Sequence, residues 1–221
     1  FCIYTVRKHI FVKAEWCNSM NEKFFSISKE KQERIIRCAY EVFSQNSYKE
    51  ASMSKIADAG GISKSLLFHY FSNKREFHLY LWENAGRQFC EIQTRHYTGA
   101  TGFFEIIQQR FMARFTFMRE HPVIFLFVLR AFFEEDPELN DPVRSPVRKL
   151  CDKKTEEIMA LAETSGFRPR VDVKFLIQEI EGFFLITLWQ IFSQGKWDVN
   201  YLEKNFTKRI EQWKAVYLKE N

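Results

Sequence analysis

A group of hydrogen-bonding side chains lies between residues 52 and 74 of this 221-residue chain. Hydroxyl, imidazole and ammonium groups of these types bind nucleic acid, where phosphate contacts fix position and contacts to base edges specify sequence. Lys64 can donate to guanine O6 and N7, and Leu66 can contact a thymine methyl group. The residue types therefore indicate ten candidate DNA contacts: Ser52, Lys55, Ser63, Lys64, Ser65, Leu66, Phe68, His69, Tyr70 and Lys74.

Two short helices joined by a glycine turn are predicted to position these side chains. Ser52 and Ser63 can cap the two helices, because a serine hydroxyl accepts from a free N–H at a helix start. Gly60-Gly61 can end the first helix, since glycine adopts the left-handed conformation. This is the layout of a helix-turn-helix, whose second helix lies in the DNA major groove. Four apolar residues are predicted to form its core: Ile56, Ala57, Leu67 and Phe71.

The charge distribution agrees with a DNA-binding unit. Residues 23–75 carry ten Lys and Arg against five Asp and Glu, and the formal net charge of the whole chain is +5. The positive excess is thus concentrated around the helix-turn-helix, as a phosphate-binding surface requires. The alternative is an ordinary solvated basic face. For His69 the alternative is a capping or packing role.

Residues 29–81 resemble the DNA-binding domain of the tetracycline-repressor (TetR) family. The matching motifs are Ile56-Ala57, Gly61-Ile62-Ser63-Lys64, Leu67, and Phe68-His69-Tyr70-Phe71 followed by Lys74. The resemblance implies phosphate contacts by residues at three matching positions, which are Ser52, Tyr70 and Lys74.

The recognition helix departs from the family pattern at three positions. Ser65 stands where the family often has Gly or Ala, Leu66 where it often has a small hydroxyl residue, and Phe68 where Tyr is common. Leu66 and Phe68 make this helix more apolar. We therefore expect more methyl and shape readout, and fewer hydrogen bonds to bases.

The whole chain is predicted to be all-α, with about nine helices, because apolar residues recur at helical spacing and Gly and Pro are few. A helix over 28–46 completes a three-helix DNA-binding unit, and a proline-rich loop is predicted over 134–146. Further helices are predicted over 73–96, 102–119, 122–134, 171–194 and 198–219, and one more from 143 or 146 to 165. We expect residues 1–22 to be an N-terminal extension outside the fold, 23–75 the helix-turn-helix domain, and 76–221 a regulatory ligand-binding and dimerisation domain.

The helix over 171–194 has apolar residues on two sides. One side carries Leu176, Ile177, Ile180, Phe184 and Leu188, and the other carries Phe175, Phe183 and Ile186. One side can be buried within the subunit and the other against a partner, and the resemblance implies a four-helix bundle formed with the last helix. Such a homodimer holds two reading units about one DNA turn apart, which favours a near-palindromic operator. The alternative is a thick single-chain core.

Aromatic and methionine side chains between residues 111 and 189 could line a pocket for a small, largely apolar effector. The alternative is that they are plain core. In the family that this chain resembles, ligand binding releases DNA, and the helix over 73–96 is the expected lever. The candidate ligand contacts are Phe111, Phe115, Met118, Phe125, Phe132, Met159, Phe183 and Trp189.

The sequence has no signature of an enzyme. It has no G-x-S-x-G, P-loop, H-E-x-x-H or G-x-G-x-x-G motif, so we predict no catalytic residue, cofactor or metal. Five scattered cysteines without a C-x-x-C pair favour reduced thiols in a cytoplasmic protein. No run of about 18 apolar residues occurs, so no membrane partner is expected.

These features predict a homodimeric, cytoplasmic, ligand-responsive transcriptional repressor. The alternatives are a DNA-binding activator without a ligand, and an all-α interaction or scaffold protein that binds no DNA. Salt-dependent binding to duplex DNA distinguishes the scaffold from the other two.

Overall fold

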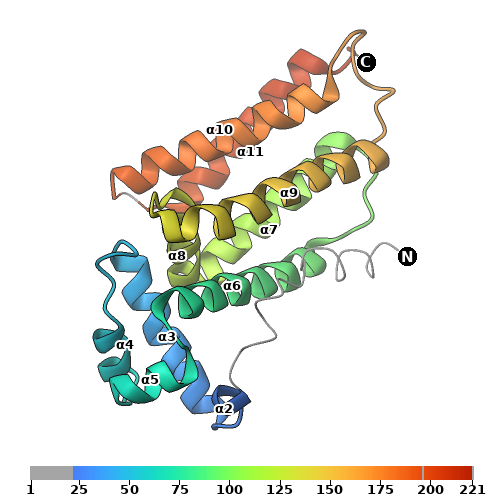
Figure 1. The fold of residues 1–221 in the computed structure, drawn as a ribbon. Helices are drawn as coiled ribbons and strands as arrows, with labels where there is room; N and C mark the ends of the chain where they lie inside the picture. Colours follow the sequence, from blue (N-terminus) through green and yellow to red (C-terminus); the bar gives the residue numbers. More distant parts are fainter. Residues whose placement is uncertain (1–21, 196, 221) are drawn as a thin grey trace. The chain divides into compact units, whose positions relative to one another are not determined.

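The computed structural model describes residues 22–195 and 197–220, and every helix or strand element among them is an α-helix (Figure 1). The all-α prediction is confirmed. The predicted extension over 1–22 lies outside the described residues except for Glu22. Two compact units are present: one runs to Glu91 and resumes over His121–Lys149, and the other comprises Ile92–Glu120 and the chain from Leu150. This division differs from the predicted 23–75 and 76–221, because residues 121–149 pack with the N-terminal helices.

The first unit contains the predicted three-helix arrangement. Its helices are α2 (Glu22–Phe25), α3 (Lys29–Gln45), α4 (Met53–Ala59), α5 (Lys64–Tyr70), most of α6 (Lys74–His96), α8 (Pro122–Phe133) and the start of α9 (Pro137–Leu161). Serine caps begin three of them: the hydroxyls of Ser28, Ser52 and Ser63 each accept a backbone N–H three residues on. Capping therefore fixes where α3, α4 and α5 start, as predicted for Ser52 and Ser63.

Aromatic rings fill the core of the first unit. The rings of Phe71 and Phe77 stack with centroids 4.1 Å apart, and Phe24 of α2 packs against Phe71 at 4.9 Å. The short helix α2 was not predicted, although Phe24 is almost fully buried. On the other side of this core α3 lies beside α8, where Arg130 Nε donates to the Ser44 carbonyl over 3.0 Å.

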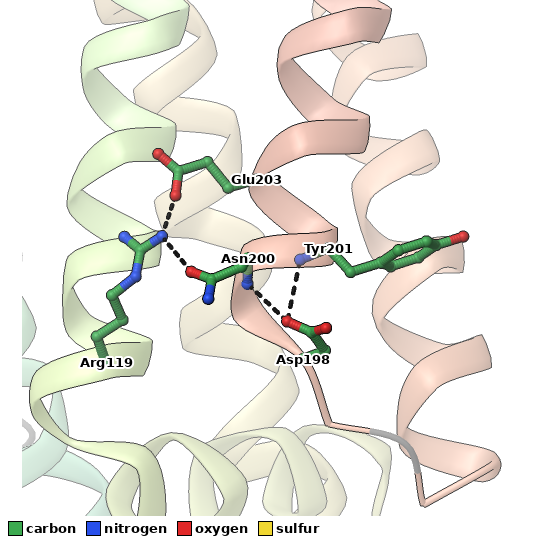
Figure 2. A network of polar contacts seen from close by, with 5 residues as sticks. All are labelled: Arg119, Asp198, Asn200, Tyr201 and Glu203. Atoms are coloured by element: carbon green, nitrogen blue, oxygen red, sulfur yellow. Dashed lines mark hydrogen bonds and ion pairs between the residues drawn. The ribbon is translucent and has the colours of Figure 1, made fainter.

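The second unit is built from α7 (Phe103–Glu120), the later part of α9, α10 (Val173–Ser193) and α11 (Val199–Tyr217). Phe111 of α7 stacks on Phe206 of α11 with centroids 3.8 Å apart. Figure 2 shows how the same helices are joined at their ends, where Arg119 binds Asn200 and Glu203. Asp198 caps α11, because its carboxylate accepts the N–H groups of Asn200 and Tyr201.

The predicted loop over 134–146 is wrong, because α9 begins at Pro137. Proline suits a first helical position, and Asp136 Oδ1 accepts the N–H of Glu138 over 2.9 Å. Proline at 142 has no N–H to give to the carbonyl of Glu138, four residues earlier. Arg75 Nε donates to that carbonyl instead, over 3.0 Å. This contact from α6 satisfies the group that the interior proline would leave unpaired.

Candidate nucleic-acid interface

The helix-turn-helix has a closed core and one exposed side. Helices α4 and α5 have seven residues each. Ile56, Ala57, Leu67 and Phe71 are all buried in their common core, so this prediction is confirmed. The side chains that remain outside are therefore held on a rigid base.

The turn between these helices contains two glycines, Gly60 and Gly61, and its backbone requires glycine at one of them. Gly61 has a φ of +66°, in the left-handed region that other residues rarely adopt. A Cβ there would meet no atom closer than 3.6 Å, so the backbone conformation, not crowding, requires glycine. Gly60 has a φ of −74° and is right-handed.

The candidate contacts on α5 divide into an outward and an inward group. Lys64, Ser65, Phe68 and His69 are exposed, with Phe68 at 37% of its full exposure. Leu66 is half-buried and packs against the core of the unit. The outward side of α5 therefore combines a cation, a hydroxyl, an imidazole and one aromatic ring.

Three further candidates have local partners. The Ser63 hydroxyl accepts the N–H of Leu66 over 3.1 Å and lies 3.0 Å from Ser65 Oγ. The Ser52 hydroxyl accepts the N–H of Lys55, whose own side chain is exposed. A capping serine keeps its hydroxyl proton, so both can still donate to a phosphate oxygen.

Tyr70 was predicted to contact phosphate, but it is only 5% exposed. The ring lies against Phe24, with centroids 5.6 Å apart. Within residues 22–195 and 197–220 its hydroxyl has no hydrogen-bond partner. Any DNA contact by Tyr70 must therefore be made through that hydroxyl, and it stays a prediction.

Lys74 has a different position from the one that the sequence suggests. Its ammonium donates to the carbonyls of Tyr48 (2.7 Å), Lys49 (3.2 Å) and Ala51 (3.4 Å), and lies 4.5 Å from the Tyr48 ring centre. An ammonium has three donors, and these bonds use all three. The geometry favours a role in holding the α3–α4 loop, residues 46–52, over direct contact with phosphate.

The α3–α4 loop is also held from the α8–α9 corner, residues 134–138. Glu134 accepts the backbone N–H of Tyr48 over 2.7 Å, and Glu138 accepts its hydroxyl over 2.9 Å. Burial and the bond to the Glu138 carboxylate raise the pKa of Tyr48, so its hydroxyl stays a donor. Sequence reasoning missed these acidic partners because it predicted a solvated loop here.

His78 is a buried titratable residue that the sequence did not single out. It is 3% exposed and lies among the rings of Phe43, Tyr48 and Phe127. Its Nδ1 has no hydrogen-bond partner among the described residues. Burial, assisted by the charge of Lys74, lowers the pKa of His78 to about 3, so it is neutral at physiological pH.

The eight predicted ligand contacts are not brought together within either unit. Phe111, Phe115 and Met118 are buried core residues of the second unit, and Met159 and Trp189 are largely exposed. Phe183 packs edge-on against Trp213, with centroids 5.6 Å apart. Phe125 and Phe132 lie on α8 in the first unit. Their role as ligand contacts stays a prediction, and for the first three the packing favours a core role.

Charged side chains that were not predicted connect helices of the second unit. Both Nη atoms of Arg114 lie 2.8 Å from the Glu181 carboxylate, and the guanidinium lies 4.3 Å from the Phe111 ring centre. Arg110 approaches Glu157 at 3.4 Å, and burial lowers the pKa of Arg110. The signal in the sequence was a pair of arginines four residues apart on an otherwise apolar helix.

Helix α10 has two apolar sides as predicted, except that Phe183, which was predicted on the second side, is half-buried and packs against Trp213 of α11. Leu176, Ile177, Ile180, Phe184 and Leu188 are buried, whereas Phe175 is 63% and Ile186 61% exposed. A Cβ at Gly182 would have no neighbour within 4 Å. Among the described helices α10 alone is long and apolar enough to cross a membrane, a test that the core helix of a soluble protein also passes.

The described residues contain no group of three His, Cys, Asp or Glu that could hold a metal ion. Cys38 and Cys90 are not in disulfides. The side chains of Cys2, Cys17 and Cys151 lie outside the part that the structure describes.

Comparison with known proteins gives one match in sequence and many in fold. Residues 35–81 match the family described as bacterial regulatory proteins, tetR family. No curated protein matches the chain in sequence.

Three solved structures illustrate the likeness in fold. A TetR family transcriptional regulator from Chloroflexus aurantiacus has a TM-score of 0.64 at 17% identity, over 90% of this chain and 99% of its own. FadR from Bacillus subtilis, in complex with stearoyl-CoA, has a TM-score of 0.62 at 18% identity, over 80% of this chain and 96% of its own. The ketosteroid transcriptional regulator KstR2 of Mycobacterium tuberculosis has a TM-score of 0.62 at 17% identity, over 88% of this chain and 98% of its own. At these identities the likeness shows the fold alone.

Proposed function

Because this chain belongs, through residues 35–81, to the TetR family of bacterial regulatory proteins, we propose that it is a dimeric transcriptional repressor. It binds a near-palindromic operator and releases it when a small, largely apolar effector binds. The observation that carries this proposal is the outward side of α5, where Lys64, Ser65, Phe68 and His69 stand exposed on a closed core.

The outward side of α5 suits insertion into a major groove. Lys64 supplies a donor for guanine, and its ammonium lies 6.0 Å from the Phe68 ring centre, so the two side chains form one surface. His69 adds a second polar group at the other end of the helix. Ser52, Lys55, Ser63 and the hydroxyl of Tyr70 supply hydrogen bonds to phosphates, and Leu66 contributes packing beneath this surface.

A homodimer through α10 and α11 accounts for the second apolar side of α10. Phe175 and Ile186 are large apolar side chains that a single chain leaves in water. The open space at Gly182 allows a partner helix to approach closely. Pairing these faces buries both and places two copies of α5 on one duplex.

The nature of the effector is supported by two relatives and by the residues of the second unit. FadR from Bacillus subtilis is described with stearoyl-CoA, and KstR2 as a ketosteroid regulator. Stearoyl-CoA carries a long apolar acyl chain on a charged coenzyme A group, and a ketosteroid is a bulky, largely apolar molecule. The second unit here is rich in aromatic side chains, which such molecules favour. The effector must bind the DNA-incompetent state more tightly than the competent one, with α6 as the lever between them.

The test is binding of the purified full chain to duplex DNA from the region upstream of its own gene. We expect a preferred near-palindromic site and an affinity that falls steeply with salt. A folded, dimeric protein that binds no such duplex would support the scaffold reading. DNA binding that activates transcription and responds to no effector would support the activator.

A further inference from the structure

We infer that Arg34 of α3 is a phosphate-contacting residue that also positions the turn before the recognition helix. This inference rests on the proposed DNA binding. Arg34 stands one residue before the region that matches the tetR family, and it is not among the candidate contacts given by the sequence.

The side chain of Arg34 lies along the glycine turn. Its Nε donates to the carbonyl of Gly60 over 2.9 Å. Its Nη2 and Cζ lie 3.6 and 3.8 Å from the place that a Cβ on Gly61 would occupy. The planar guanidinium thus lies against the two glycines that follow α4, at the start of the four-residue turn to α5.

This contact satisfies a group that the end of α4 leaves open. The last carbonyls of a helix have no partner within the helix, and a cation there interacts favourably with the helix dipole. Gly60 is the C-cap of α4, so the bond from Arg34 closes that end. The contact fixes the turn from which Ser63 and α5 begin.

The same guanidinium keeps donors for a second partner. Arginine has five N–H donors, and within the described part of the chain only the Nε–H of Arg34 is engaged in a hydrogen bond. The residue is exposed, and its four Nη donors have no hydrogen-bond partner among the described residues. Guanidinium binds phosphate through two parallel hydrogen bonds, which is the geometry that these donors offer.

Arg37, one turn further along α3, provides the contrast. It is exposed and carries the same charge, but no hydrogen bond or ion pair holds it among the described residues. A side chain that is already held loses less conformational entropy when it binds. Arg34 is therefore preorganised for phosphate, whereas Arg37 is an ordinary surface cation.

The experiment compares Arg34→Gln with Arg37→Gln in the full chain. The probe is the duplex that the wild-type protein selects from a randomised pool, and the readout is the slope of log K against log salt. For Arg34→Gln we expect the slope to shrink by about 0.9 for each recognition helix bound, with a loss of about tenfold in affinity. For Arg37→Gln we expect a much smaller change in slope. An unchanged slope in Arg34→Gln, or an equal change in both variants, overturns the inference.

A second variant covers the case in which Arg34→Gln does not fold, judged by its circular-dichroism melting curve. Arg34→Lys keeps the charge but cannot span Gly60 and a phosphate with one nitrogen. We expect it to keep the wild-type salt slope and to bind about tenfold more weakly, and wild-type affinity in this variant contradicts the bridging role. Wild-type protein that binds no duplex at all overturns the proposed function itself, which separates the two failures.

Discussion

The buried imidazole of His78 couples the stability of the first unit to pH. Burial lowers its folded-state pKa to about 3, whereas an unfolded chain has a histidine pKa near 6.5. Below about pH 6.5 His78 therefore binds a proton in the unfolded state but stays unprotonated in the folded state. The stability from keeping His78 neutral is complete above pH 6.5 and is lost as the pH falls towards 3.

His78→Phe should remove this pH dependence, because phenylalanine has no proton to take up. For the wild type we expect the free energy of unfolding to fall by about 1.4 kcal/mol per pH unit between about pH 6 and pH 4 from this residue. Urea unfolding at a series of pH values measures the slope. The exposed His69, changed to Gln, is the control. A variant with the wild-type slope would show that His78 does not carry the effect.

Single residues also show what sequence could and could not predict. The caps at Ser52 and Ser63 were predicted because capping is local in sequence. The helical period placed Phe68 outside and Leu67 inside, but Leu66 was predicted to face the DNA groove and is instead half-buried against the core. The partners of Arg34 and Lys74 depend on tertiary contacts that no local pattern reports.

The α3–α4 loop shows how several helices position α4. Lys74 at the start of α6 donates to three of its carbonyls, and Glu134 and Glu138 accept from Tyr48. Within the first unit, the α8–α9 corner and the start of α6 thus both form hydrogen bonds with this loop. Helix α9 also explains why sequence failed here. Its interior proline is compensated by Arg75, and a contact so distant in sequence cannot be read from the proline itself.

Lys74→Met should loosen the loop without removing a phosphate contact. We expect the free energy of unfolding to fall by about 1 to 3 kcal/mol, because three carbonyls lose a charged donor. DNA binding should weaken while its salt slope stays close to that of the wild type. Thermal unfolding and salt titration measure the two effects.

Tyr70→Phe is the companion variant, since it removes one hydroxyl and keeps the buried ring. It should leave stability nearly unchanged and weaken binding to all duplexes by a similar factor.

For Lys74→Met, wild-type stability together with a reduced salt slope would contradict the loop-holding role and favour the direct phosphate contact that the sequence suggested.

At the scale of the whole molecule, the proposed function requires one chain both to bind DNA and to pair with a second copy. Sequence periodicity predicted both sides of α10, since a stripe pattern reports which residues face inward. It could not predict that the eight candidate ligand contacts would be divided between the two units, because it does not report which helices share a core. Phe111 and Phe115, for example, fill the core with Phe184 and Phe206.

Ile186→Glu should convert a dimer into a monomer, because it places a charge in the centre of the proposed interface. Sedimentation velocity measures the oligomeric state. Met159→Glu on α9 is the matched control, since Met159 is also largely exposed but lies outside α10 and α11. A monomeric wild type, or a dimeric Ile186→Glu, would contradict an interface on this side of α10.

The central claim is that the outward side of α5 reads DNA sequence, and a single competition measurement tests it most directly. The wild-type chain and Lys64→Ala are each titrated with the selected duplex and with a scrambled duplex of equal length and composition. We expect the wild type to prefer the selected duplex by at least about a hundredfold, and Lys64→Ala to lose about 1 to 3 kcal/mol of that preference. Equal wild-type affinity for the two duplexes would contradict it.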